Sequence, residues 1–153
     1  MRRVIPSLIG VLAIAGLTDS AYLALKHLGL LGSEPFVVAS ACVMAKGPCE
    51  TAVNSDVGGI LGIPAPILGG LYFAAVVVLA IVRIHFGRWL FPYATLAFLA
   101  AGLGYSGYLV YKMVAVLDQP CPYCLAAHGI NVAAFALYVV SFYTEAISRR
   151  VST

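Results

Sequence analysis

The four cysteines of this chain fall into two groups, Cys42 with Cys49 and Cys121 with Cys124. A pair separated by two residues, like the second, either exchanges disulfides or supplies half of a zinc site. The six residues between Cys42 and Cys49 are more than a zinc knuckle normally holds. Two short-range disulfides are therefore the favoured interpretation, and a zinc site built from all four cysteines is the alternative.

Proline residues define the setting of the second pair. Pro120 ends the preceding turn, and Pro122 suits the first position of a helix. Cys121 is then expected at or near the N-cap, and Cys124 within the first turn. Unpaired N–H groups and the positive end of the helix dipole stabilise a thiolate there. The sequence therefore predicts a reactive Cys121–Cys124 pair rather than a structural disulfide.

The first pair allows two interpretations. A Cys42–Cys49 disulfide would close a small ring in which Gly47 and Pro48 provide the turn. So short a ring stabilises a fold by about 2–3 kcal/mol. The residues alone leave open whether this pair is a structural staple or a redox pair.

The composition places these cysteines in a membrane protein, since 62% of the 153 residues are hydrophobic and only 10% are charged. Four segments approach the ~20 apolar residues that span a bilayer. We therefore expect an all-α integral membrane protein, a single domain over residues 1–153 with four transmembrane helices in a bundle. A long extracytoplasmic loop, which could hold a short helix, would cover residues 27–62. The expected helices cover about residues 4–26, 63–84, 90–111 and 121–143.

The basic residues predict the orientation. All lysines fall on one side of this topology, and all arginines fall on the other. By the positive-inside rule, both termini are expected in the cytoplasm and all four cysteines outside it, in the oxidising compartment. This indicates a multi-pass protein of the cytoplasmic (inner) membrane. The scattered basic residues and the net charge of +3 do not indicate a nucleic-acid partner.

Two polar residues follow the second pair into the last apolar segment. His128 and Asn131 are spaced so that they share one helix face with Cys121 and Cys124. Taken alone, either residue is explained by an interhelical hydrogen bond. Beside two cysteines, a pocket for an electron acceptor is the better interpretation, because polar groups in membrane helices tend to face interior cavities.

The expected acceptor is a quinone. A dithiol releases two electrons and two protons when its disulfide forms, and the sequence holds neither a dinucleotide fingerprint nor a haem attachment motif. A lipid-soluble quinone, of the ubiquinone or menaquinone type, takes up both and resides in the bilayer. We expect it as the substrate, with no metal and no nucleotide.

Several motifs in order resemble one family. The first apolar segment ends "SAYLALKH", the loop holds Cys42 and Cys49, and Ser55 follows six residues later. The second segment opens with "GIPAPILGGLYF", and the last opens with "CPYCLAAHGIN". This arrangement is similar to the prokaryotic branch of the vitamin K epoxide reductase family over nearly the whole chain.

The resemblance implies a four-helix bundle around a quinone, capped by the outer loop. Cys121 and Cys124 would form the active-site disulfide, with Cys124 facing the quinone. Cys42 and Cys49 would shuttle electrons from outside, with Cys49 attacking Cys121. Ser55 would bind the quinone, as we expect of His128 and Asn131.

The resemblance also implies a partner. In the prokaryotic branch it is a DsbA-like, thioredoxin-fold protein, which we expect as a separate chain because no such domain follows residue 153. The expected activity is that of a thiol:quinone oxidoreductase that supports disulfide formation outside the cytoplasm.

Two departures from the family pattern keep alternatives open. Animal members have a tyrosine where this chain has His128, and an asparagine near Ala65. These departures count against reduction of vitamin K epoxide and favour quinone reduction. Epoxide reduction is therefore only the second candidate activity, and a non-enzymatic membrane protein with structural disulfides is the third. The resemblance assigns no role to Asp19, which lies inside the first apolar segment.

Overall fold

A computed structural model describes residues 3–28, 30, 63–116 and 121–151. These residues form helices α1 (Val4–His27), α4 (Ala65–Phe86), α5 (Pro92–Tyr111) and α6 (Pro122–Val151), with a π-helical turn, η2 (Lys112–Val116), after α5. Four helices are long and apolar enough to cross a membrane. The predicted all-α fold with four transmembrane helices is confirmed. The possible short helix of the outer loop lies outside the described residues.

Proline and glycine residues set the ends of these helices. Pro64 precedes α4, whose start at Ala65 lies two residues after the predicted one. Gly87 ends α4 with φ of 69°, and its N–H group donates to the Arg83 carbonyl at 3.0 Å. A left-handed φ of this kind favours glycine. Helix α6 continues to Val151, beyond the predicted transmembrane segment of about residues 121–143.

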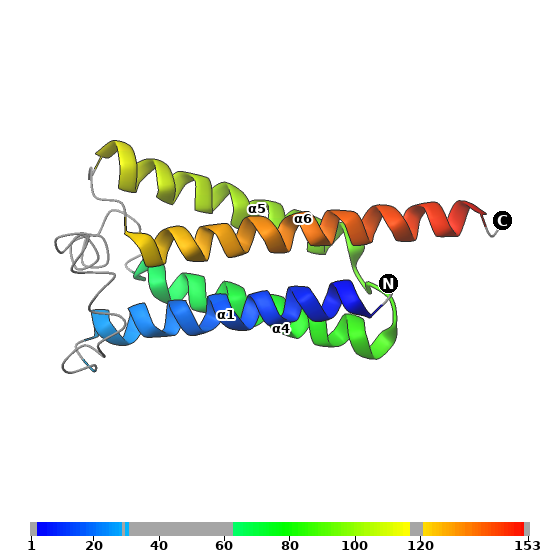
Figure 1. The fold of residues 1–153 in the computed structure, drawn as a ribbon, viewed down its shortest axis with the longest axis horizontal. Coiled ribbons are helices and arrows are strands. Elements are labelled where there is room, and N and C mark those ends of the chain that lie inside the picture. Colours follow the sequence, from blue (N-terminus) through cyan, green and yellow to red (C-terminus); the bar gives the residue numbers. More distant parts are fainter. Residues whose placement is uncertain (1–2, 29, 31–62, 117–120, 152–153) are drawn as a thin grey trace.

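The helices form a bundle in which α1 packs against both α4 and α6, and α6 also packs against α5. Both termini lie at one end of the bundle, together with the connection between α4 and α5 (Figure 1). The end of α1 and the starts of α4 and α6 lie at the opposite end. We call this second end the cysteine end, because α6 begins there at Cys121.

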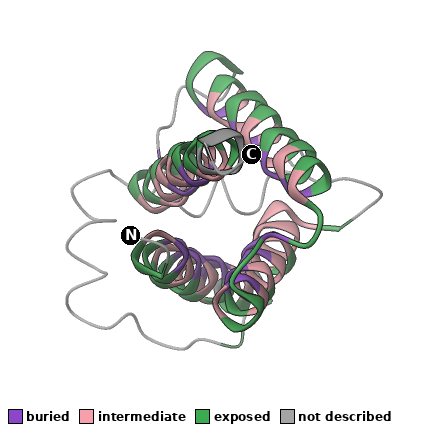
Figure 2. Ribbon diagram, turned by 90° about the vertical axis from the view of Figure 1, so that its right-hand side faces the viewer, coloured by how far each residue is buried: buried purple, intermediate pink, exposed green. Residues whose placement is uncertain are grey.

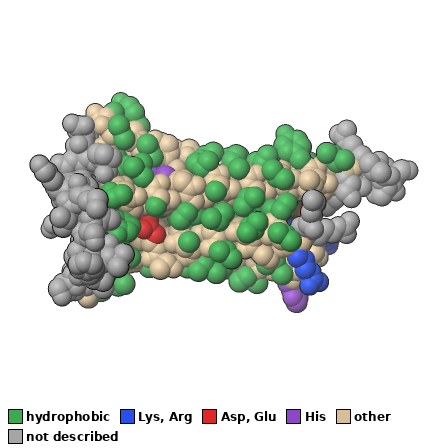
Figure 3. All heavy atoms as spheres, viewed as in Figure 1, with side chains coloured by type: hydrophobic (Ala, Val, Ile, Leu, Met, Phe, Trp, Pro, Cys, Tyr) green, Lys and Arg blue, Asp and Glu red, His purple; other side chains and the backbone are tan. Residues whose placement is uncertain are grey.

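The burial pattern of the bundle is that of helices surrounded by lipid. Viewed from the end that carries the termini, the buried positions face the centre and the exposed positions face outward (Figure 2). The outward positions are largely apolar along the length of the helices (Figure 3). An apolar outer surface of this kind suits the hydrocarbon core of a bilayer. The helical backbone suits it too, because its N–H and C=O groups are paired within each helix.

Small residues let the helices approach closely. A Cβ atom on Gly16 of α1 would lie 2.6 Å from the ring of Phe73 on α4, closer than side chains pack. The ring of Phe73 therefore lies over the α1 backbone, and Phe73 is buried. Glycine at such contacts is the usual way in which membrane helices gain packing energy.

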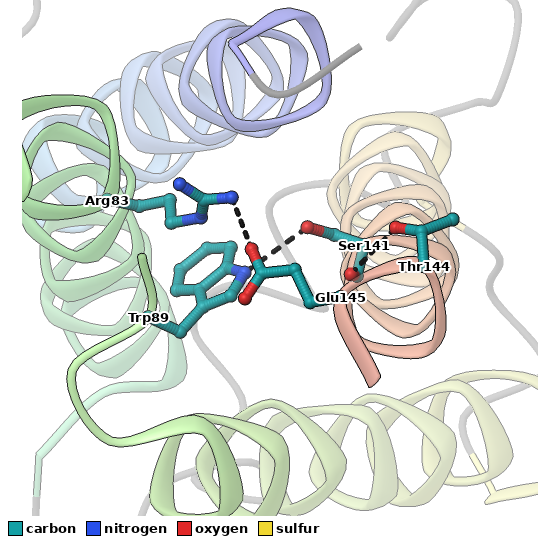
Figure 4. Close-up of polar contacts among 5 residues, drawn as sticks. All are labelled: Arg83, Trp89, Ser141, Thr144 and Glu145. Carbon is teal, nitrogen blue, oxygen red and sulfur yellow. Dashed lines mark hydrogen bonds and ion pairs between the residues drawn. The ribbon is translucent and has the colours of Figure 1, made fainter. Parts of the chain in front are cut away.

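Polar contacts join the helices at the end that carries the termini. Arg83 of α4 forms an ion pair with Glu145 of α6 (Figure 4). The Trp89 indole N–H, in the connection after α4, donates to the Ser141 hydroxyl at 3.2 Å. The Arg83 guanidinium also lies 5.7 Å from the Trp89 ring centroid, within cation–π range. The ion pair therefore fixes α4 to α6 at this end.

Loss of the Glu145 carboxylate should destabilise the bundle, because Arg83 is only 3% exposed and its charge would then be unpaired. Breaking a buried pair in this way costs about 3–5 kcal/mol. Glu145 itself is 26% exposed. We therefore expect Glu145→Leu to lower the free energy of unfolding by about 3 kcal/mol, the lower end of that range, in a mixed-micelle titration.

The double variant Arg83→Met/Glu145→Leu should recover most of this loss, since no charge is left unpaired. Arg88→Met is the matched control, because Arg88 is an exposed arginine in the connection that follows α4. Its effect should stay within about 0.5 kcal/mol. A double variant as unstable as Glu145→Leu would contradict the interpretation.

Candidate active site

Cys121 lies immediately before the first residue of α6. Pro122 is the first helical residue, and the Leu125 N–H group donates to the Cys121 carbonyl at 3.0 Å. An N-cap residue accepts the first intrahelical bond in this way. The predicted placement of Cys121 at the N-cap and Cys124 in the first turn is confirmed.

The two cysteines of this pair differ in exposure. Cys121 is fully buried, whereas Cys124 is intermediate. The Cys121 backbone N–H donates to the Met113 sulfur at 3.2 Å. Met113 belongs to the π-helical turn η2, and such turns are frequent at functional sites. The turn thus places a thioether against the N-cap and covers the Cys121 side of the pair.

Helix α1 supplies two further side chains at the cysteine end. The ring of Tyr22 lies 6.0 Å from the ring of Tyr123, centroid to centroid, which brings the α1 residues near position 22 against the first turn of α6. Asp19, one turn earlier on α1, interacts electrostatically with Cys121. An acidic residue inside a membrane helix is rare and usually functional, so the sequence indicates that Asp19 matters. It does not indicate which residue Asp19 contacts.

The polar face predicted for α6 points into the bundle. His128 is half-buried and Asn131 is 3% exposed, whereas the intervening Gly129 and the following Val132 are exposed. Both polar residues lie on the same side of α6 as Cys124, and of the two it is Asn131 that is buried in the bundle. A line of polar groups therefore runs from the cysteine end into the interior of the bundle.

Asn131 connects three helices. Its amide oxygen accepts a hydrogen bond from the Tyr72 hydroxyl of α4 at 2.7 Å. Its amide nitrogen donates to the Ser106 hydroxyl of α5 at 2.8 Å. Each amide atom retains capacity for a second bond. The sequence did not reveal Tyr72 or Ser106, because their contacts depend on how the helices are rotated.

The Tyr72 ring is held in place by α5. It stacks on Phe98 with centroids 5.1 Å apart. A Cβ atom on Gly102 would lie 2.4 Å from a Tyr72 ring carbon. Glycine at position 102 is therefore required for the ring to lie where its hydroxyl reaches Asn131.

The remaining predicted site residues, Cys42, Cys49 and Ser55, lie outside the described residues. Within the part that the structure describes, no group of three or more His, Cys, Asp or Glu side chains is placed to hold a metal ion.

Comparison with known proteins agrees with this geometry. The sequence model of the vitamin K epoxide reductase family matches residues 7–139. A thiol-disulfide oxidoreductase of Arabidopsis thaliana, LTO1, is 27% identical over 131 aligned residues, which cover 79% of this chain and 32% of the plant protein. The chain therefore spans about a third of that relative's length.

Substitution of Gly102 should disturb the Tyr72–Asn131–Ser106 hydrogen bonds. Overpacking of a filled interior costs about 1–3 kcal/mol, and we expect Gly102→Ala to lower the free energy of unfolding by this amount. Gly104→Ala is the matched control, because a Cβ atom there meets nothing within 4 Å. The control should be neutral or more stable by up to about 1 kcal/mol, since alanine favours helix. Equal stability of the two variants in mixed micelles would contradict this assignment.

Proposed function

Because this chain belongs to the vitamin K epoxide reductase family, we propose that it is a thiol-based oxidoreductase that reduces a membrane quinone. The observation that carries the proposal is the Cys121-x-x-Cys124 pair at the start of α6, followed by a polar face that points into the bundle. A dithiol there lies beside the bilayer, where its electron acceptor is dissolved. The printed name of the plant relative, a thiol-disulfide oxidoreductase, supports the same chemistry.

The proposed electron path has three steps. A dithiol of a DsbA-like partner reduces the Cys42–Cys49 disulfide, Cys49 then attacks Cys121, and the Cys121–Cys124 dithiol passes two electrons to the quinone. The first two steps are attacks of a thiolate on a disulfide. DsbA is a strong oxidant at about −120 mV, so its reoxidation requires a still stronger sink such as a quinone.

The two cysteines of α6 have different proposed roles. Cys121 is buried at the N-cap, and Cys124 is more exposed and lies deeper along the inward face. The family resemblance implies Cys121 as the sulfur that Cys49 attacks. The deeper position of Cys124 along α6 supports Cys124 as the sulfur that faces the quinone. The positive end of the α6 dipole stabilises the thiolate that each exchange releases.

His128, Asn131 and Ser55 are the proposed quinone ligands. His128 lies four residues after Cys124, so both project from one side of α6. Asn131 lies one turn further and is oriented by Tyr72 and Ser106. A histidine or amide N–H group in this line would donate to a quinone carbonyl and stabilise its reduced anion.

The proposed location is the cytoplasmic membrane, with the cysteine end outside and both termini inside. The four apolar helices make this a multi-pass membrane protein. The arrangement of Figure 1, with both termini at the end opposite Cys121, supports the orientation expected from the arginine and lysine positions.

Reduction of vitamin K epoxide is the second candidate activity, since the family takes its name from that reaction. The residues of the described site favour quinone reduction instead, because His128 and Ala65 stand where the animal enzymes place quinone-binding tyrosine and asparagine. An assay with both substrates on the same preparation separates the two activities.

Substitution of single cysteines tests the path. With a reduced DsbA-like donor and a short-chain ubiquinone, Cys124→Ala should abolish quinone reduction, because the sulfur proposed to pass electrons to the quinone is missing. Cys49→Ala should block transfer from the reduced protein donor. When this variant is mixed instead with the oxidised donor, the Cys42 thiolate should attack the donor disulfide and leave a mixed disulfide, detected on non-reducing gels. Full activity of Cys124→Ala would refute the mechanism. The mechanism would also be refuted if both disulfides of the wild-type protein stayed oxidised while it was incubated with the reduced donor and excess quinone.

Substitution of His128 tests the quinone contact. A single hydrogen bond contributes about 1 kcal/mol, so His128→Ala should raise the apparent KM for the quinone about fivefold. Gly129→Ala is the matched control, because position 129 is exposed and a Cβ atom there meets nothing within 4 Å. An unchanged KM in His128→Ala would return this histidine to a purely structural role.

A further inference from the structure

Asp19 carries a polar atom that the fold does not satisfy. Its Oδ2 atom is buried and has no hydrogen-bond partner among the residues that the structure describes. The residue lies within the membrane-spanning part of α1, Val4–Leu25. A carboxylate in this position is expensive, and such groups mark functional sites in membrane proteins.

The position of Asp19 relates it to the active-site cysteines. Helix α1 packs directly against α6. The contact between Tyr22 and Tyr123 places the last turns of α1 over the first turn of α6. Cys121 lies within electrostatic reach of the Asp19 carboxyl. The other described acidic residue, Glu145, lies at the opposite end of the bundle and pairs with Arg83.

Cys121 needs a nearby proton acceptor. Its side chain has no exposed surface, so its thiol cannot transfer a proton directly to bulk water. Yet the thiol must lose its proton before its sulfur can attack the Cys124 sulfur, because the thiolate is the nucleophile.

We propose that Asp19 accepts the proton of Cys121 when the Cys121–Cys124 disulfide forms, and returns it when the disulfide is reduced. The inference rests on the proposed function for its quinone step. In that step the S–S bond forms, both S–H bonds break, and the quinone takes up two electrons and two protons to become the quinol. Asp19 first takes the proton from the Cys121 sulfur. It then releases this proton to the quinol or to solvent and returns to its carboxylate form.

A proton acceptor and a simple electrostatic neighbour predict opposite effects. A fixed negative charge beside Cys121 disfavours the thiolate, because like charges in a shared site oppose each other. If Asp19 acted only through its charge, its removal would speed attack by Cys121. If Asp19 carries the proton, its removal slows the attack, because the buried thiol then loses this carboxylate as its proton acceptor.

The test uses the full-length protein in lipid nanodiscs and follows single turnovers in both directions. In the forward direction, reduced protein is mixed with a short-chain ubiquinone and quinone absorbance is recorded. In the reverse direction, oxidised protein is mixed with dithiothreitol, and the reduced thiols are trapped and counted. The second measurement involves no quinone, so it reports on the proton alone.

We expect Asp19→Asn to slow both directions about 10²-fold, the low end of the usual contribution of general acid–base groups. Asp19→Glu, which keeps the carboxyl, should restore most of the rate. Thr18→Val is the matched control, since Thr18 is an exposed polar residue of the same turn whose hydroxyl donates to the Ile14 carbonyl at 2.9 Å. Its rates should equal those of the wild type.

Rates in Asp19→Asn that equal or exceed those of the wild type would overturn the inference, as would failure of Asp19→Glu to exceed Asp19→Asn. Should Asp19→Asn fail to fold, the comparison of Asp19→Glu with Thr18→Val in the dithiothreitol reaction decides: rates equal to the control support the inference, and a loss as large as 10²-fold opposes it. If the wild-type protein reduced no quinone, the proposed function would be wrong. A slower dithiothreitol reaction in Asp19→Asn would still support proton transfer by Asp19.

Discussion

The position at which α6 begins is the constraint on which the rest of the site depends. Pro122 sets the first residue of α6, because proline fits the start of a helix and not its interior. The cysteine pair therefore lies at the end of the helix. An α-helix turns by about 100° per residue, so Cys124, His128 and Asn131 lie on the same side of α6.

The polar contacts of the bundle hold this arrangement at two levels. Near the termini, the ion pair of Arg83 with Glu145 fixes α6 to α4. Closer to the cysteines, the Asn131 side chain binds Tyr72 and Ser106, so α6 is also tied to α4 and α5 at a second depth. Two contacts at different depths restrict rotation of α6 about its axis. Because buried polar groups are costly when unpaired, each contact disfavours every other rotation of the helix.

The sequence predicted the features that local chemistry determines. Apolar length revealed the four spans, and the prolines around Cys121 indicated the start of the helix. The residue spacing indicated the shared face of His128 and Asn131. The interhelical contacts could not be predicted in this way, because these helices are apolar on nearly all sides and their rotation leaves no pattern. Gly102 is an example: only the structure shows that it makes room for Tyr72. Helix α6 also continues beyond the predicted span, because a change to polar residues marks the edge of the membrane and not the end of a helix.

The environment of Cys121 differs from that of Cys124 in a way that local sequence does not show. Both cysteines lie near the same helix dipole, which by itself favours a thiolate at either. Burial and the neighbouring Asp19 carboxyl oppose a charge on Cys121, while Cys124 keeps part of its surface accessible. The two sulfurs of the pair therefore differ in exposure and in their charged neighbour. In the proposed mechanism, Cys121 is the buried sulfur that exchanges its proton with Asp19, and Cys124 is the accessible sulfur that faces the quinone. This difference arises from two other elements, α1, which is far from the motif in the sequence, and η2, which lies just before it.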